Sequence, residues 1–337
     1  MFGGVIHGRS WRLLAAGIAI GGLAFWLVLA HTDIAGVRAI LENDVDWVLA
    51  GLALLAYGLF FVGKALRWGY LLSPSVEVSL LRRTAYVLIG YAGNVVLPFQ
   101  AGEVARGYLL SKHHRIKLAT ALSGIAVEKV LDFFALLLLL VWALWTVDSP
   151  SPLAETVALS LAGFLSLVGL LFFGLLIKPA ATGALVDRGM AHCPARIAAR
   201  LGPSVHDAIA GLAALRQGSL LWKLVAASLV TWGIMLVTLC LAIKAVQVDV
   251  PLAVAIVVLV LAAVGLALPT SPGFIGTLQA AFVLGMVPFG VTQEAAVAAS
   301  LVYQVLTTIP PLAIGLLCLA LLGLLRAKRS LPVGLDK

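Results

Sequence analysis

Long apolar segments, separated by short polar ones, limit this chain to one class of fold. They cover residues 13–30, 47–63, 84–99, 118–147, 153–177, 220–243, 250–268, 274–290 and 295–325. Several of them reach the ~20 residues that an α-helix needs to cross the hydrocarbon layer of a bilayer. Only 11% of the 337 residues are charged, whereas soluble domains carry about a quarter. The sequence therefore predicts an all-α integral membrane protein with about six full spans plus two re-entrant helical hairpins.

The distribution of basic residues predicts the orientation of these segments. If residues 84–110 form a hairpin that returns to its own side, the Lys and Arg residues gather on one face, Lys64 and Arg67 included, with the exception of Arg38, Lys129 and Lys244. Cytoplasmic loops carry such an excess. The alternative, in which 84–110 crosses fully, moves the basic stretch 178–223 outside, and limbs of ~14 residues reach only ~21 Å. We expect both termini in the cytoplasm of a bacterial inner membrane.

Two short phrases of the same form interrupt the apolar runs and suggest a repeat. Each is Leu-Pro, three residues and Gly, at residues 97–102 and 268–273. They lie at equivalent places in two units, 47–147 and 220–325, whose predicted orientations are opposite. Inverted repeats with broken helices are a transporter design. For 250–290, two full spans remain an alternative to a hairpin. The stretch 178–219 between the units is predicted to be an amphipathic linker on the cytoplasmic surface.

Ionisable residues in the middle of the 118–147 helix are the strongest chemical signal. Glu128 lies about 16 Å along the helix from Lys117, and Glu128 and Asp132 share a face, with Lys129 beside them. A charge at this depth costs at least about 2.5–3.5 kcal/mol, so it needs a partner or a wet cavity. Two interpretations stay open: an ion-pair cluster that locks helices together, or a polar path with proton-coupling carboxylates. The path requires water to reach Glu128.

The hairpin tips supply the other candidate binding residues. A helix that begins inside the membrane presents free backbone N–H groups that suit a phosphate or carboxylate, and an Arg one turn further binds phosphate with two donors. In the second tip, neutral groups would bind the same kind of anion. The alternative is that the small residues of this tip only allow the helices to pack closely. The candidates are Asn94, Pro98, Gln100, Gly102, Glu103 and Arg106 in the first tip, and Pro269, Thr270, Ser271, Gly273 and Gly276 in the second.

Several familiar signatures are absent from the sequence. It contains no GxxxxGK[ST], HExxH, CxxC or GxSxG pattern, so ATP-driven pumping, a cofactor, a metal site and common hydrolytic chemistry are not expected. The net charge of +8 is attributed to cytoplasmic loops rather than to nucleic-acid binding.

The stretches GYAGNVVLPFQAGEVARGYLL, AVEKVLD, LALPTSPGFIGTLQAAF and LVYQV resemble the flippase-like membrane domain of lysylphosphatidylglycerol synthases. The resemblance covers nearly the whole chain and adds Tyr303 to the candidate site. In the family an Arg commonly follows this Tyr, whereas here it is Gln304. The chain ends soon after Arg326, so a soluble aminoacyl-transferring domain and lysyl-lipid synthesis are not expected. The resemblance implies movement of lipids or lipid-linked groups between leaflets.

A lipid carrier is therefore the leading hypothesis, with a phospholipid, polyprenyl-linked or hopanoid-type lipid as the partner. A membrane enzyme that acts on headgroups, with Glu128 and Asp132 as acid and base, is one alternative. A structural partner of a lipid-synthesis enzyme is the other. Homo-oligomers are compatible with each of the three.

Overall fold

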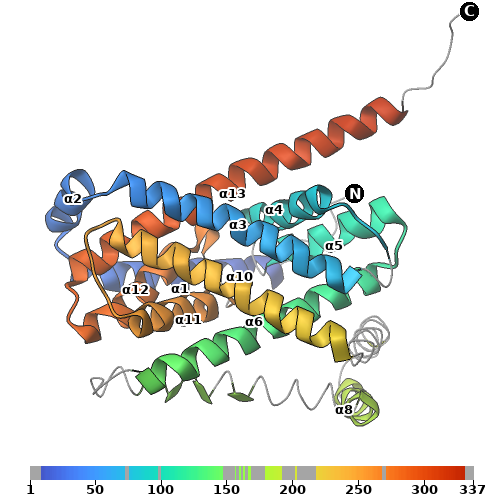
Figure 1. Cartoon of the computed structure of the whole chain (residues 1–337), viewed down its shortest axis with the longest axis horizontal. Coiled ribbons are helices and arrows are strands. Elements are labelled where there is room, and N and C mark those ends of the chain that lie inside the picture. Colours follow the sequence, from blue (N-terminus) through green and yellow to red (C-terminus); the bar gives the residue numbers. More distant parts are fainter. Residues whose placement is uncertain are drawn as a thin grey trace, which may run out of the picture.

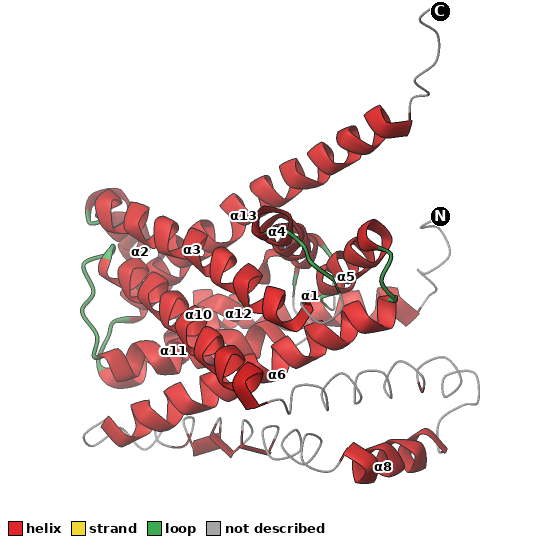
Figure 2. Cartoon of the chain, turned by 45° about the vertical axis from the view of Figure 1, so that its right-hand side comes forward, coloured by secondary structure: helices red, strands yellow, loops and turns green. Residues whose placement is uncertain are grey.

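The computed structural model describes residues 9–72, 76–97, 100–146, 179–191, 218–267 and 271–330, with a few isolated positions between 156 and 167 and at 202. Figure 2 shows helices and loops and no strand in this part of the chain. The prediction of an all-helical fold is confirmed for these residues. The apolar segment 153–177 and most of the predicted linker 178–219 lie outside the described residues.

The helices follow the predicted apolar segments closely (Figure 1). In chain order they are α1 (Arg9–Ala30), α2 (Ile34–Asn43), α3 (Trp47–Leu72), α4 (Leu80–Val96), α5 (Ala101–His114), α6 (Leu118–Thr146), α8 (Pro179–Ala191), α10 (Gly218–Lys244), α11 (Leu252–Ala267), η1 (Pro272–Phe274), α12 (Thr277–Met286), η2 (Val287–Phe289) and α13 (Gln293–Ser330). By length and composition, α3, α10 and the Gln293–Leu324 part of α13 can cross a bilayer. The end of α1 and α2, bent by 91°, pass the same test together. The count of six full spans stays a prediction.

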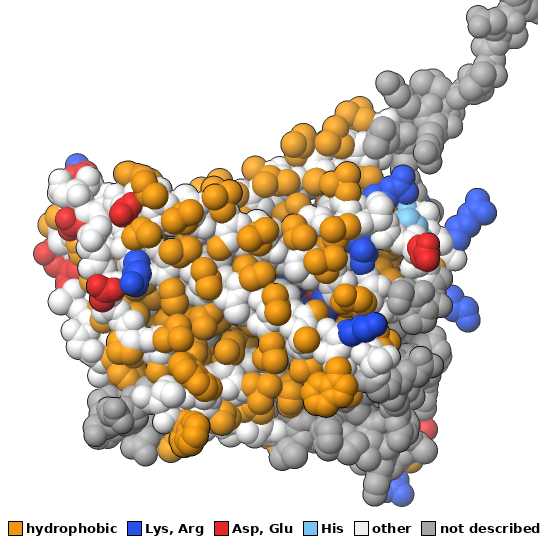
Figure 3. All heavy atoms as spheres, in the orientation of Figure 1, with side chains coloured by type: hydrophobic (Ala, Val, Ile, Leu, Met, Phe, Trp, Pro, Cys, Tyr) orange, Lys and Arg blue, Asp and Glu red, His pale blue; other side chains and the backbone are white. Residues whose placement is uncertain are grey.

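The surface has the pattern of a protein that lies in lipid. Large apolar side chains such as Leu55 and Leu59 on α3 are 68% and 59% exposed. Figure 3 shows such side chains over the middle of the molecule, with acidic groups gathered at one end and mostly basic groups at the other. An apolar belt of this extent is typical of a membrane or protein interface. Together with the apolar helices it marks a multi-pass membrane protein.

Helices α4 and α5 form the first helical hairpin, and glycines allow its two limbs to touch. A Cβ atom on Gly102 would collide with the carbonyl oxygen of Gly90 and lie 2.6 Å from the backbone nitrogen of Asn94. Gln100, just before α5, has a left-handed φ of 51°. The turn is therefore made where Pro and Gly predicted a break, although Pro98 itself lies outside the described residues.

Helices α11 and α12 pack together as the second helical hairpin, with η1 at its tip. Gly273 and Gly276 have φ angles of 70° and 86°, which only Gly adopts readily. A Cβ on Gly276 would also collide with the carbonyl oxygen of Gly21 in α1. Ser271 donates its hydroxyl to the carbonyl of Ile275 (2.6 Å) and so closes the turn. Pro269 and Thr270 lie outside the described residues.

Helices α3 and α10 lie side by side and run antiparallel (Figure 1, Figure 2). Asp46, before α3, donates its N–H to the carbonyl of Ala245, just after α10 (2.7 Å). Near the other ends, Arg67 on α3 donates to Ser228 on α10 (2.9 Å). These two contacts show that α3 and α10, one from each half of the molecule, run in opposite directions.

The other contacts among α3–α6 and α10–α13 come in matched pairs. α3 packs on α4 as α10 packs on α11, α4 packs on α5 as α11 packs on α12, and α5 packs on α6 as α12 packs on α13. Between the halves, α4 packs on α13 as α6 packs on α11. If α3, α4, α5 and α6 are exchanged for α10, α11, α12 and α13 in that order, the same pairs of helices are in contact.

Candidate functional site

Charged side chains from three helices meet in the interior of the molecule. This charge cluster consists of Lys64 and Arg67 on α3, Glu103 and Arg106 on α5, and Glu128, Lys129 and Asp132 on α6. All of them are buried except Lys129, whose side chain is 35% exposed. Ionisable groups at this depth persist only when they are paired or reach water.

Glu128 is the centre of the cluster. Its Oε1 atom lies 2.7 Å from Lys64 Nζ and 3.1 Å from Arg67 Nη2, and its Oε2 atom accepts a hydrogen bond from Arg106 Nη2 at 2.8 Å. Its side chain is fully buried. One carboxylate therefore ties α3 and α5 to the middle of α6.

Asp132, one turn further along α6, joins a fourth helix, α10, to the cluster. Its Oδ1 atom accepts hydrogen bonds from Arg67 Nη1 (2.6 Å) and from the indole Nε1 of Trp232 on α10 (2.8 Å). Its Oδ2 atom lies 3.5 Å from Lys64 Nζ. Asp132 thus accepts hydrogen bonds from a cationic group and from a neutral N–H group.

Glu103, in the first turn of α5, forms the outer part of the cluster. Its Oε2 atom lies 2.7 Å from Arg106 Nε and its Oε1 atom 3.0 Å from Lys129 Nζ. The Arg106 guanidinium also lies over the ring of Trp68, 4.8 Å from its centroid, an arrangement that is favourable for a buried cation.

The cluster holds more positive than negative charge. When all of its members are ionised, the two lysines and two arginines outnumber the carboxylates of Glu103, Glu128 and Asp132 by one. A buried, uncompensated charge is costly in a medium of low dielectric constant. The cluster therefore has room for one additional negative charge.

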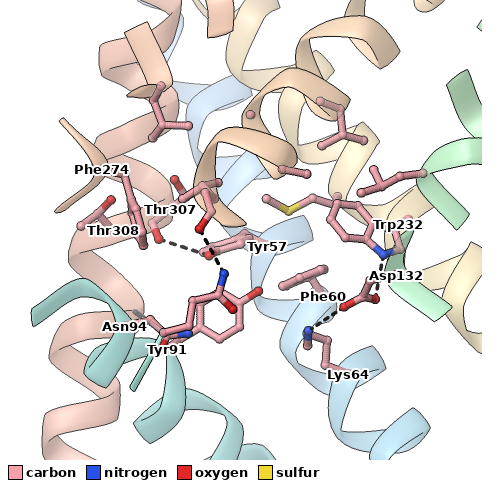
Figure 4. Close-up of a pocket in the computed structure, with 18 of the residues that line it drawn as sticks. Tyr57, Phe60, Lys64, Tyr91, Asn94, Asp132, Trp232, Phe274, Thr307 and Thr308 are labelled. Atoms are coloured by element: carbon pink, nitrogen blue, oxygen red, sulfur yellow. Dashed lines mark hydrogen bonds and ion pairs between the residues drawn. The ribbon is translucent and has the colours of Figure 1, made fainter. Parts of the chain in front are cut away.

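A cavity of about 160 Å³ borders the cluster (Figure 4). Lys64, Glu103, Lys129 and Asp132 form its charged side. The opposite wall is apolar and comes from the second hairpin, with Leu259, Ala262, Ala263, Leu266, Phe274 and Leu278. The cavity is therefore amphipathic: one side offers charge and hydrogen bonds, and the other offers only apolar contact.

The tips of both hairpins reach this cavity. Asn94 and Gln100 from the first hairpin and Phe274 from the second line it. Gln100 donates its side-chain N–H to the carbonyl of Leu266 at 3.0 Å, which links the two tips directly. Two segments that are far apart in the sequence thus close one end of the cavity together.

A proline in α13 supplies a further polar contact beside the cavity. Pro311 has no N–H, so the carbonyl of Thr307 loses its helical hydrogen bond. The Tyr57 hydroxyl of α3 donates to this carbonyl at 3.1 Å (Figure 4). Tyr57 and Thr307 both line the cavity, so the contact that Pro311 makes possible lies in its wall.

The buried polar contacts at the second hairpin come from glutamine side chains and not from charged ones. Gln279 accepts from the backbone N–H of Gly276 (2.7 Å) and donates to Gln304 (2.6 Å), which in turn donates to the carbonyl of Gly273 (2.7 Å). The pair Gln279 and Gln304 thus holds the tip in shape. No buried charged residue is found among the described residues of α10–α13.

The structure brings most of the candidate residues to one place. Those that line the cavity are Asn94, Gln100, Glu103, Lys129, Asp132 and Tyr303. Arg106 and Glu128 belong to the cluster but do not line the cavity. Glu128 is 0% exposed, so the polar path in which water reaches Glu128 is not found, and the interpretation of an ion-pair cluster fits this residue. Gly102, Ser271, Gly273 and Gly276 shape the two tips. Pro98, Pro269 and Thr270 fall outside the described residues.

Two residues were misplaced by the sequence analysis. Lys64 and Arg67 were counted with the cytoplasmic basic residues, but α3 continues to Leu72 and both side chains are buried, 3% and 0% exposed. They are the partners of Glu128 and Asp132. Their spacing of three, which places them on one helix face, was a signal that could have identified them.

Among the described residues, no group of His, Cys, Asp and Glu is arranged to hold a metal ion. A search of curated proteins finds no match to this chain. A family model does match: the lysylphosphatidylglycerol synthase TM region, over residues 14–315. The match extends from α1 into α13 and includes both hairpins and the whole charge cluster.

Proposed function

Because this chain belongs to the lysylphosphatidylglycerol synthase TM region family, a family of membrane proteins related to lipids, we propose that it is a flippase-like lipid carrier. It moves the headgroup of a phospholipid or lipid-linked molecule between leaflets of a bacterial cytoplasmic membrane. The acyl chains stay in the bilayer while the headgroup passes through the protein.

The observation that carries this proposal is the amphipathic cavity between the hairpin tips. A lipid headgroup needs polar contacts, and the adjoining glycerol and first methylene groups need apolar ones. The cavity offers both, with Lys64, Lys129 and Asp132 on one side and Leu259 and Leu266 on the other. Small-molecule sites are typically concave and mostly apolar, with a few polar groups that fix orientation.

The arrangement of helices also supports the proposal. Transporters commonly consist of inverted repeats whose broken helices meet at the substrate site. The antiparallel α3 and α10, and the matched contacts of α3–α6 and α10–α13, are what such a repeat requires. In this view the two hairpins are re-entrant, and the Gln100–Leu266 hydrogen bond closes one entrance.

The roles of the charged residues follow from their exposure to the cavity. Glu128 has three cationic partners and does not border the cavity, so we assign it the role of anchor rather than of proton-coupling group. Lys64, Glu103, Lys129 and Asp132 are available for contact with the headgroup.

Lipid exchange in reconstituted vesicles tests this function. The purified protein is placed in phosphatidylcholine vesicles that contain a trace of fluorescent lipid, and a membrane-impermeant quencher reports how fast label reaches the outer leaflet. Ala263→Trp places a large side chain in the cavity wall on α11, and Leu252→Trp, on the exposed part of the same helix, is the matched control.

We expect rapid exchange with the wild type and with Leu252→Trp, and exchange as slow as in protein-free vesicles with Ala263→Trp. Thr308→Trp, which fills the cavity from α13, is a second variant in case the first does not fold. Wild-type protein that exchanges no lipid faster than empty vesicles contradicts the proposal.

A further inference from the structure

We propose that the cavity selects lipids whose headgroups carry a net negative charge, with Lys129 as the contact of that charge and Glu103 as its resident substitute when no lipid is bound. This inference rests on the proposed function, because it names the class of lipid that the same cavity takes. It differs from that function in that it concerns selection, which is measured by binding alone.

The charge balance of the cluster favours an anionic ligand over a cationic one. Glu128 is shared by three cations, and Asp132 by two cations and the Trp232 indole. The fourth cation, Lys129, has only Glu103 as a carboxylate partner in the cluster, and Glu103 also pairs with Arg106. A bound anion would bring the cluster to neutrality, whereas a cationic headgroup would add to the excess.

Lys129 is the cation best placed to receive that anion. Its side chain is 35% exposed, whereas Lys64, Arg67 and Arg106 are at most 4% exposed. An ammonium group has three donors, and the only ion-pair partner found for Lys129 among the described residues is Glu103, at 3.0 Å. Donors of Lys129 therefore remain for a ligand in the cavity that it lines.

Glu103 can give up Lys129 without being left unpaired. Its second oxygen lies 2.7 Å from Arg106 Nε, and that contact does not involve the cavity. A phosphate oxygen that takes the place of Glu103 beside Lys129 would thus exchange one anionic partner for another. Without a ligand, the Glu103 carboxylate occupies the position beside Lys129. A lipid phosphate must compete with this carboxylate, and this competition sets the affinity of the lipid.

Neutral donors around the same space suit an oxyanion with several acceptor atoms. Tyr91, Asn94, Tyr303 and Lys129 all line the cavity. The phenol O–H groups and the amide N–H groups of Asn94 can donate to an oxyanion. The apolar wall of Leu259 and Leu266 faces this polar side. The site therefore fits the anion of a lipid better than a free, fully hydrated phosphate ion.

Lipid binding to the purified protein tests this selection. The protein in mild-detergent micelles is incubated with equimolar phosphatidylglycerol, which is anionic, and phosphatidylcholine, which is net neutral, and native mass spectrometry measures the ratio bound. The variants are Lys129→Gln, Lys129→Arg, Glu103→Gln and the double variant Glu103→Gln/Lys129→Gln. Lys112→Gln, an exposed lysine at the end of α5, is the matched control.

We expect the wild type to bind phosphatidylglycerol at least about tenfold better than phosphatidylcholine, because both phosphates can pair with Lys129 but the choline cation adds a positive charge beside a cluster that already has an excess of positive charge. Lys129→Gln should lose this preference, and Lys129→Arg and Lys112→Gln should keep it. Glu103→Gln should strengthen it severalfold, and only while Lys129 is present, so the double variant should match Lys129→Gln.

Equal binding of the two lipids by the wild type overturns the inference, and so does a Glu103→Gln variant that loses the preference as Lys129→Gln does. Displacement of phosphatidylglycerol by an equimolar amount of inorganic phosphate would show a site for a soluble anion and would also overturn it. Selective binding without lipid exchange in vesicles would contradict the proposed function alone. Exchange without selectivity would contradict this inference alone.

Discussion

Replacement of Glu128 by Gln should destabilise the folded protein by about 3–5 kcal/mol, the cost that is typical when one partner of a buried ion pair is removed. The variant keeps the volume of the side chain, so no cavity is created. It removes the one carboxylate, among the described residues, that contacts Lys64, Arg67 and Arg106 together. The excess positive charge of the cluster doubles as a result.

The size of the effect follows from the distances. At separations of 2.7 to 3.1 Å, Coulomb's law with an effective dielectric constant of about 20 gives roughly 5–6 kcal/mol for each pair. Most of this gross attraction offsets the cost of removing the ions from water. In the variant that cost remains for all three cations while the attraction is gone, so the loss should lie at the upper end of the range.

Equilibrium unfolding in mixed micelles of a mild detergent and dodecyl sulfate, followed by helical circular dichroism, measures this loss. Glu42→Gln is the matched control, because Glu42 pairs with Arg38 on the exposed surface of α2, where its side chain is 57% exposed. That pair should contribute no more than about 0.5 kcal/mol. Equal unfolding free energies for the two variants would refute the assignment of Glu128 as the anchor of the cluster.

Further predictions concern the first hairpin, the hydrogen bond between Tyr57 and Thr307, and pH. Gly102→Ala should prevent the close approach of α4 and α5 and lower the unfolding midpoint strongly, whereas Gly58→Ala, which meets no atom within 4 Å, should be neutral or slightly stabilising. Tyr57→Phe leaves the Thr307 carbonyl without its donor and should cost about 0.5–1.5 kcal/mol in the same unfolding titration. Burial and, second, the charge of Arg82 lower the pKa of His114, at the end of α5; the unfolded chain therefore binds a proton first, and stability should fall as pH drops below about 6.5, a dependence that His114→Gln should reduce.

The sequence predicts the positions of helices and breaks well because these depend on local chemistry. Pro and Gly cannot continue an α-helix without cost, and α4 ends at Val96 and α5 begins at Ala101, as the first phrase indicates. The apolar run 118–147 becomes α6 (Leu118–Thr146). Such signals are contained within a few neighbouring residues.

The partners of the buried charges could not be predicted in the same way. A Lys or Arg near the end of an apolar run is typical of the membrane interface. The three-residue spacing of Lys64 and Arg67 places them on one face of α3, but it does not show that this face meets Glu128. Glu128 and Asp132 share a helix face, as predicted, yet only Asp132 reaches the cavity. The difference depends on where α3 and α5 pack, which is a long-range property.

For the lipid carrier that we propose, the confinement of the buried charges among the described residues to α3, α5 and α6 has a consequence for the kinetics of passage. In such a carrier a headgroup that arrives from one leaflet would meet its electrostatic partner early along its path, and one from the other leaflet would meet it late, although α3–α6 and α10–α13 share the same set of helix contacts. The two directions should then show different half-saturation concentrations. Detailed balance nevertheless forbids such a skewed profile from accumulating lipid on one side, so net enrichment would require an external source of work.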